Sequence, residues 1–343
     1  MHFATLTHST QVYVMTELKY AEAVRAALRA ELATDERVVV LGEEVGALGG
    51  VFTTTKGLQR EFGSERVLDT PISEAAIAGW AVGAAMVGMR PVVEIMFMDF
   101  VMLAMDQIVN GAAKLRYMSN GQLSVPLVFR MPAGGGTRHG PQHSQQLESW
   151  FAHVPGLIVA MPSCAVDAYT MLRQSIRSDD PVVFVESKYL YFRESGEIDE
   201  SVSPDLPLTQ TARVVREGTD LTVVTAGRMV QRVAEAARDL HESDGIDCEI
   251  IDLRYLWPLD TDAVARSVAS TSKLAVVHEA VQTFGWGAEI ASWVAEYCLA
   301  DLDGPIVRIG SQRAPVPFAE VLENAVIPTE ALIKEKLREL ATY

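Results

Sequence analysis

The chain has 343 residues, a formal net charge of −16 and 49% hydrophobic residues. This length predicts two domains, and the acidic balance argues against nucleic-acid binding, which needs clustered basic residues. Cys164, Cys248 and Cys298 form no Cys-x-x-Cys pair, which argues against a zinc site or a disulfide framework and favours a reducing compartment. No basic flank leads into an apolar signal core, and no apolar run is long enough to cross a membrane, so we expect a cytoplasmic protein.

The first half of the chain alternates predicted helices and strands. Residues 1–14 are polar and mixed, and we expect them to be an extension before the first domain at 15–194. Apolar stripes and valine-rich runs predict the elements that follow. Strands are expected at 38–41, 67–68, 91–96, 126–131, 157–160 and 182–186, and helices at 17–32, 58–62, 75–89, 101–117 and 167–176.

A change of composition separates the two halves. Residues 195–210 contain Ser-Gly, several acids and two prolines, which predicts a linker. The second domain, at 211–343, again alternates strands and helices. Strands are expected at 221–225, 248–252, 274–277 and 307–309, and helices at 230–240, 263–270, 287–298 and 329–340. The sequence therefore predicts two α/β domains with largely parallel sheets.

One segment of the first half places a carboxyl at the start of an uncharged helix. Pro71 disfavours helix, Ser73 is a good N-cap and Glu74 follows it directly. The fifteen residues 75–89 carry no charge, which predicts a helix buried nearly all round. Small residues recur every fourth position in it, at Ala75, Gly79 and Gly83. Glu74 is either a first-turn acid that complements the helix dipole or a functional carboxyl.

Other reactive side chains gather at strand ends and helix starts of the first domain. They are Glu43, Glu44, Asp99, Phe100, His139 and His143. The chain has no Walker loop, dinucleotide fingerprint, nucleophile elbow or His-Glu-x-x-His motif. The triplet at 134–136 is either a phosphate-binding turn or a flexible loop that lets the backbone approach a ligand or partner. His278 lies at the end of a predicted strand and is either a structural or a catalytic residue.

Several motifs together carry a family resemblance. They are Leu-Gly-Glu-Glu-Val-Gly at 41–46, Gly-Gly-Val-Phe at 49–52, Thr-Pro-Ile-Ser-Glu at 70–74, Asp-Gln-Ile-Val-Asn at 106–110, Gln-His-Ser-Gln at 142–145, His-Val-Pro-Gly-Leu at 153–157, Ile-Asp-Leu-Arg at 251–254 and Pro-Val-Pro-Phe at 315–318. With them the chain resembles the beta subunit of the thiamine-diphosphate-dependent decarboxylating component of 2-oxo acid dehydrogenases. The resemblance implies a transketolase-like pyrimidine-binding domain followed by a transketolase C-terminal-like domain.

The resemblance also implies roles for individual residues. Glu74 matches the glutamate that hydrogen-bonds the aminopyrimidine ring and so promotes loss of the thiazolium proton. Phe100 matches the aromatic residue on the pyrimidine face, and His143 a loop histidine that acts near the substrate. Glu44 lies in the matching acidic loop beside the pyrimidine. A structural potassium ion, bound by backbone carbonyls in some relatives, would lie at Leu127, Ser175, Ile176, Ser178 and Asp180.

The resemblance further implies a partner. The family's Gly-Asp-Gly segment, which binds magnesium and the diphosphate, is absent, since Asp244-Gly245 and Asp303-Gly304 lack the preceding glycine. We therefore expect an alpha subunit to hold that half of the cofactor in an α2β2 assembly. A pyruvate or branched-chain 2-oxo acid would be the substrate, and the lipoyl group of a dihydrolipoyl acyltransferase the acceptor. The alternatives are an acetoin dehydrogenase beta subunit and a scaffold subunit that only docks the acyltransferase.

Overall fold

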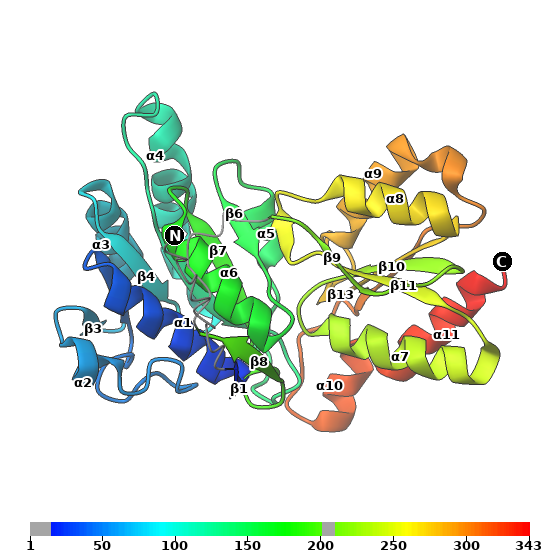
Figure 1. Ribbon diagram of the computed structural model, residues 1–343, viewed down its shortest axis with the longest axis horizontal. Coiled ribbons are helices and arrows are strands. Elements are labelled where there is room, and N and C mark those ends of the chain that lie inside the picture. Colours follow the sequence, from blue (N-terminus) through cyan, green and yellow to red (C-terminus); the bar gives the residue numbers. More distant parts are fainter. Residues whose placement is uncertain (1–14, 201–209) are drawn as a thin grey trace, which may run out of the picture.

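The computed structural model describes residues 15–200 and 210–343. Two α/β domains lie side by side, the first on the left of Figure 1 and the second on the right. The predicted two-domain α/β class is confirmed. The predicted extension at 1–14 lies outside the described residues.

The first domain is built on a seven-stranded sheet that is parallel except at one edge. Its strand order is β12 (Tyr255–Trp257), β6 (Ile158–Ala160), β7 (Val182–Ser187), β5 (Val128–Ala133), β4 (Arg90–Glu94), β2 (Val38–Gly42) and β3 (Val67–Asp69). Neighbouring residues of β4 enter different cores, Val92 on one face and Val93 on the other. Burial on both faces explains why these strands are continuous apolar runs.

Helices cover both faces of this sheet. One face carries α1 (Tyr20–Thr34) and α6 (Ala165–Arg177), which pack on each other. The other face carries α3 (Glu74–Met86) and the helical segments that follow β4. These are η1 (Met98–Ala104), η2 (Gln107–Ala112) and α4 (Ala113–Met118), and the short helices α2 (Leu58–Phe62) and α5 (Glu148–Ala152) complete the domain.

The second domain has a five-stranded sheet. Its order is β14 (Val307–Ser311), β13 (Leu274–Val281), β10 (Leu221–Thr225), β11 (Cys248–Asp252) and β9 (Arg213–Arg216), with only β9 antiparallel to its neighbour. The helices are α7 (Met229–Asp244), α8 (Thr261–Thr271), α9 (Gly287–Tyr297), η3 (Leu299–Asp301), α10 (Glu320–Val326) and α11 (Glu330–Ala341). Among the described residues, no helix has the length and apolar character needed to span a bilayer.

Two strands contradict the predicted separation into halves. Part of the predicted linker at 195–210 is strand β8 (Ser195–Asp199), which pairs antiparallel with β1 (Met15–Lys19). Strand β12, from the second half of the chain, extends the first sheet beyond β6. Composition pointed to a linker because serine, glycine and acids are rare in strands, whereas pairing with an edge partner overrides that preference. Residues 201–209 lie outside the described residues.

Two helix predictions were also wrong in part. The helix at 75–89 ends at Met86, and one face is open, since Ala75 and Gly83 are exposed and Trp80 is 48% exposed. An uncharged sequence does not distinguish a core face from an apolar surface. The helix at 101–117 is instead three segments, a 3₁₀ turn, a π-helix and α4. Ser73 does occupy the N-cap position of α3, but its side chain makes no capping hydrogen bond.

A buried ion cluster ties the three central strands together. Arg130 of β5 donates to both carboxylate oxygens of Glu186 on β7, each at 2.7 Å, and to Glu94 of β4 at 2.7 Å. All three side chains are at most 2% exposed. Tyr191 Oη donates to Glu186 and Thr54 Oγ1 to Glu94, so the cluster also holds two loops. Both oxygens of Glu186 and Oε2 of Glu94 accept hydrogen bonds, and this pairing makes the burial of the charges tolerable.

We expect Arg130→Met to destabilise the protein strongly, because two carboxylates would then face each other in the core without a cation. Breaking a buried pair on one side costs about 3–5 kcal/mol. Urea unfolding of the two proteins measures the difference. Arg37→Met is the matched control, since Arg37 is 57% exposed in its pair with Asp35 and such pairs contribute about 1 kcal/mol or less. Equal losses in the two variants would contradict the account.

Candidate functional site

Two glutamates meet at the carboxyl edge of the first sheet. Glu43 follows the last residue of β2 and is 6% exposed, and Glu74 is the first residue of α3 and is 5% exposed. Burial, and then the charge of Glu74, raise the pKa of Glu43. Glu43 Oε1 is buried and has no hydrogen-bond partner among the described residues, and the same holds for Thr70 Oγ1. Buried polar atoms without partners at a sheet edge indicate a ligand site.

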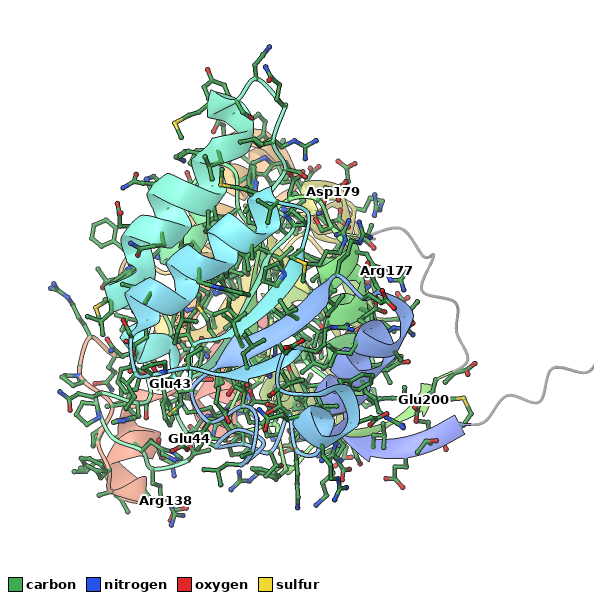
Figure 2. The ribbon with its side chains drawn as sticks, turned by 90° about the vertical axis from the view of Figure 1, so that its left-hand side faces the viewer. Glu43, Glu44, Arg138, Arg177, Asp179 and Glu200 are labelled. Carbon is green, nitrogen blue, oxygen red and sulfur yellow. The ribbon has the colours of Figure 1, made fainter. Side chains whose placement is uncertain are left out.

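The predicted residue Glu44 lies apart from this pair. It is exposed, its φ is +59°, and its carbonyl accepts from Gly50 N at 2.8 Å. Figure 2 shows both residues at the start of the loop beyond β2. Sequence analysis named Glu43 among the reactive side chains because it directly follows a buried strand, but it assigned a cofactor contact only to Glu44. The role predicted for Glu44 stays a prediction.

Aromatic rings form a second part of the site and bring two predicted residues together. Phe100 of η1 lies against the His143 ring, with centroids 5.3 Å apart and planes at 81°. Phe97 packs edge-on against the same histidine at 4.8 Å and lies 5.9 Å from His139. Edge-to-face contacts of this kind fix the orientation of a ring. Among the described residues, the structure thus joins Phe100 with His143, and Glu74 with Glu43.

The loop that carries His143 is fixed to its own domain by two side chains. Lys188 Nζ donates to the His143 carbonyl at 2.5 Å, and Asp99 Oδ1 accepts from Ser144 N at 3.2 Å and Gln145 N at 3.1 Å. Burial lowers the pKa of Lys188 to about 8. Burial also lowers the pKa of His139, with smaller effects from the Lys188 and His143 charges. The backbone around His143 is therefore held directly, not only through its side chain.

The residues predicted to bind potassium lie at the other end of the sheet. Leu127 precedes β5, and Asp180 precedes β7, whereas Glu43 follows β2. Figure 2 shows Asp179 and Glu43 far apart accordingly. Arg90 Nη1 donates to the carbonyls of Ile176 and Ser178, each at 3.0 Å. The remaining members of the set are Ser175, whose hydroxyl donates to Met171, and Asp180, whose carbonyl accepts from the Ser178 hydroxyl.

His278 has a structural environment. Its ring is 1% exposed, lies 4.9 Å from the Trp286 ring and donates through Nδ1 to the Ala280 carbonyl at 3.0 Å. Burial lowers the pKa of His278 to about 4, so the ring is neutral at physiological pH. Of the alternatives that the sequence left open, the structural one agrees with these contacts. Across the described residues, no group of three or more His, Cys, Asp or Glu side chains forms a metal site.

Family comparisons define the class of protein. Residues 16–193 match the family model "Transketolase, pyrimidine binding domain", and residues 210–333 match "Transketolase, C-terminal domain". A solved chain described as "Split gene transketolase, inactive beta4 tetramer" superimposes with a TM-score of 0.75 at 22% identity, covering 95% of this chain and 98% of that one. At this identity the likeness concerns the fold. The two domains are transketolase domains.

Sequence relatives identify the family within the transketolase class. The chain is 43% identical over 332 residues to the 2-oxoisovalerate dehydrogenase subunit beta of Bacillus subtilis, covering 96% of this chain and 100% of the relative. It is 42% identical over 327 residues to the pyruvate dehydrogenase E1 component subunit beta of Rickettsia felis, covering 95% and 99%. The chain belongs to the family of E1 beta subunits of 2-oxo acid dehydrogenases. The predicted family is confirmed.

The Glu43–Glu74 pair predicts a pH-dependent stability. The folded-state pKa of Glu43 is raised above its unfolded value, so its ionisation costs stability at pH values above the ordinary carboxyl range. We expect Glu43→Gln to raise the melting temperature at pH 7–8, because glutamine removes the like charge beside Glu74. The gain should vanish near pH 4, where both states hold the proton. Melting curves across this range provide the measurement, and a gain that grows toward acid pH would contradict the assignment.

Proposed function

We propose that this chain is the beta subunit of a 2-oxo acid dehydrogenase E1 component. The reaction is oxidative decarboxylation of a 2-oxo acid, pyruvate or a branched-chain analogue, with transfer of the acyl group to the lipoyl group of a dihydrolipoyl acyltransferase. The observation that carries the proposal is the buried Glu74 at the start of α3, paired with Glu43, in a chain of this family. Two buried carboxyls side by side at the edge of the sheet are typical of a functional site, whereas complementing a helix dipole needs only one exposed carboxyl.

Thiamine diphosphate is the proposed cofactor, and the first domain fits its pyrimidine half. Glu43 Oε1 and Thr70 Oγ1 offer buried polar atoms without partners, and Phe100 offers an aromatic face. When bound, the cofactor supplies an acidic thiazolium carbon that attacks the 2-oxo carbonyl. Glu74 would hold the pyrimidine ring by a hydrogen bond and supply or accept a proton there, and Glu44 would be a further contact on the exposed side of the loop after β2.

The histidine loop serves the substrate side of the reaction in this proposal. His143 is fixed by two aromatic edges and by the hydrogen bond from Lys188 to its carbonyl. A histidine held in this way can exchange a proton with the substrate carboxylate or with the lipoyl sulfur during acyl transfer. Phe97 and Phe100 cover part of the His143 ring and so reduce its contact with solvent.

The diphosphate half of the cofactor is assigned to an alpha subunit. Magnesium prefers carboxylate and phosphate oxygens in octahedral geometry, and the chain carries no Gly-Asp-Gly segment to present them. A side chain already binds part of the predicted potassium site. With the Arg90 guanidinium on two of the five carbonyls, the set at 127 and 175–180 fits a further cation poorly. The proposal therefore includes no potassium ion.

The exposed side of α3 supports an α2β2 assembly. Trp80 on α3 is 48% exposed, Val87 directly after α3 is 81% exposed, and Leu103 on the adjacent η1 is 64% exposed. Exposed apolar residues that gather on one face mark an interaction surface. Among the described residues a Cβ at Gly83 would meet nothing within 4 Å, so a close partner helix has room there. The free thiols of Cys164, Cys248 and Cys298 support a cytoplasmic location as part of the proposal.

Glu74→Gln should leave folding and assembly unchanged but slow exchange of the thiazolium C2 proton by about 10²–10⁴-fold, because glutamine keeps the shape and cannot pass the proton. Exchange is measured by NMR on the complex reconstituted with its alpha subunit. Glu36→Gln, an exposed glutamate before β2, is the matched control. Exchange at the wild-type rate in the Glu74 variant would end the assignment.

His143→Ala separates the two halves of the reaction. We expect C2 proton exchange to continue, because Glu74 performs that step, while reductive acylation of a lipoyl acceptor falls by about 100-fold or more. Stopped-flow and single-turnover assays of the same preparation give both rates. Equal losses in the two steps would assign the histidine to holding the loop together and remove its role on the substrate side.

The apolar face predicts the effect of a charge at Gly83. Gly83→Arg should fold normally, since its side chain enters open space in the chain itself, but it should fail to form the α2β2 complex. A guanidinium buried without a partner costs several kcal/mol. Sedimentation after co-expression with the alpha subunit tests this, with Gly83→Ala as the small-residue control. A normal heterotetramer from the arginine variant would show that α3 lies outside the interface.

A further inference from the structure

The loop between β5 and α5 is held by the second domain through its backbone. Glu279, on β13, accepts from Gly135 N at 2.7 Å, and Glu323, on α10, accepts from Gly136 N at 2.7 Å. Arg228, at the start of α7, donates to the Gly135 carbonyl at 2.6 Å. Figure 1 shows α10 at the boundary between the two domains. Three charged side chains of the second domain therefore form hydrogen bonds with two consecutive peptide groups of the first domain.

These contacts are buried and charged. Glu279, Glu323 and Arg228 are 5%, 2% and 2% exposed. Arg228 also lies 3.4 Å from Glu279 and 4.3 Å from the centre of the Tyr189 ring, so its own position is fixed. Hydrogen bonds to ionised groups are about twice as strong as neutral ones, and water does not compete for them here. These hydrogen bonds are strong enough to fix the position of the loop.

The glycines of the loop are explained by this contact. Gly134 and Gly136 have φ of +84° and +81°, which favours glycine at both positions. A Cβ at Gly134 would lie 2.9 Å from Glu279 Oε1, and one at Gly136 would collide with the Arg228 guanidinium. Of the alternatives for the triplet, the approach of backbone to a partner agrees with the structure, and the partner is the chain's own second domain.

His143 lies between two sets of anchors. On its carboxyl side, Lys188 and Asp99 of the first domain hold the backbone, as described above. On its amino side, the second domain holds Gly135 and Gly136. The segment between them contains Gly140, packed against the Phe318 ring. A cavity of 470 Å³, lined in part by Pro141, Gln145 and Glu279, lies beside the loop. The loop thus has room to move when its amino-side anchors are removed.

We propose that the second domain of this chain sets the reactive position of His143, with Glu279 and Glu323 as positioning residues for acyl transfer. The inference rests on the proposed function, because it takes His143 as the group on the substrate side. A glycine-rich loop without these anchors samples many conformations, since glycine restricts the backbone least. A displacement of about 1 Å at a reacting group can cost about 100-fold in rate. The second domain acts on the chemistry through the backbone of the loop.

Glu323→Leu and Glu323→Gln test the proposal in the complex with the alpha subunit. Leucine removes the acceptor for Gly136 N, whereas glutamine keeps a neutral one. We expect the leucine variant to lose about 10–100-fold in reductive acylation while C2 proton exchange stays within about 2-fold of wild type. The glutamine variant should keep most of the wild-type rate of reductive acylation. Amide hydrogen exchange of residues 134–140, measured by mass spectrometry without substrate, should speed up in the leucine variant.

Asp252→Asn is the matched control. Asp252 is fully buried in the second domain and accepts from Ser163 Oγ of the first domain at 2.5 Å, but it does not contact the loop. We expect Asp252→Asn to change the stability of the protein and to affect C2 proton exchange and reductive acylation to the same extent. Should Glu323→Leu not assemble, Glu279→Met removes the acceptor for Gly135 N at similar volume and supplies the same comparison, with Glu279→Gln as the variant that keeps a neutral acceptor.

Two results would overturn the proposal. The first is wild-type acyl transfer together with faster amide exchange in the leucine variant, and the second is an equal loss of both steps in the Glu323 and Asp252 variants. Failure of the proposed function itself is distinguishable, since the wild-type complex would then show neither C2 proton exchange nor 2-oxo acid turnover.

Discussion

A single buried guanidinium organises the part of the molecule in which the site lies. Arg130 binds carboxylates from both neighbouring strands of the central sheet. Glu94 also binds Thr54 in the loop after β2, and Glu186 also binds Tyr191 after β7. Strand ends and loops that are distant in sequence are therefore fixed relative to one another by one charge. The cluster lies at the edge of the sheet from which Glu43, Phe100 and the histidine loop start, so their geometry depends on it.

The site is divided in two ways. In the proposed function, acid–base chemistry on the pyrimidine ring depends on Glu74 and Phe100 of this chain, whereas the diphosphate is assigned to the alpha subunit because the sequence has no Gly-Asp-Gly segment. Within the chain, the first domain carries the proposed reactive side chains, and the second domain binds the backbone of the loop that contains His143. The apolar surface of α3 is continuous with η1, which carries Phe100, so assembly and the site share elements.

Much of the fold was predictable because strands buried on both faces are apolar runs and their helices carry apolar stripes. The runs at 38–41 and 182–186 are such cases, and both are strands. The missed elements depend on long-range pairing. Ser195–Asp199 is a strand because Met15–Lys19 lies beside it, and Tyr255–Trp257 because β6 offers a free edge. Ser195–Asp199 has the composition of a loop, and Tyr255–Trp257 has strand-forming aromatic residues but is too short to be recognised without its partner strand.

The site was predictable in its residue types and not in its orientations. Glu74, Phe100 and His143 were proposed from motifs and stay predictions, whereas the sequence does not show that Glu43 is buried and Glu44 exposed. The partner of the glycine triplet was not identifiable, because Gly136 and Glu323 are 187 residues apart in sequence. Likewise, the open face of α3 has the composition of a core helix, and only the arrangement of the other elements shows that it faces outward.

The central claim is that this chain holds one half of a cofactor site. Calorimetric titration with thiamine diphosphate and magnesium, of the chain alone and of the chain with its alpha subunit, tests it most directly. The account predicts that the chain alone binds at least about 100-fold more weakly, because two or more charge-assisted contacts are missing. Tight, magnesium-dependent binding by the isolated chain would contradict it.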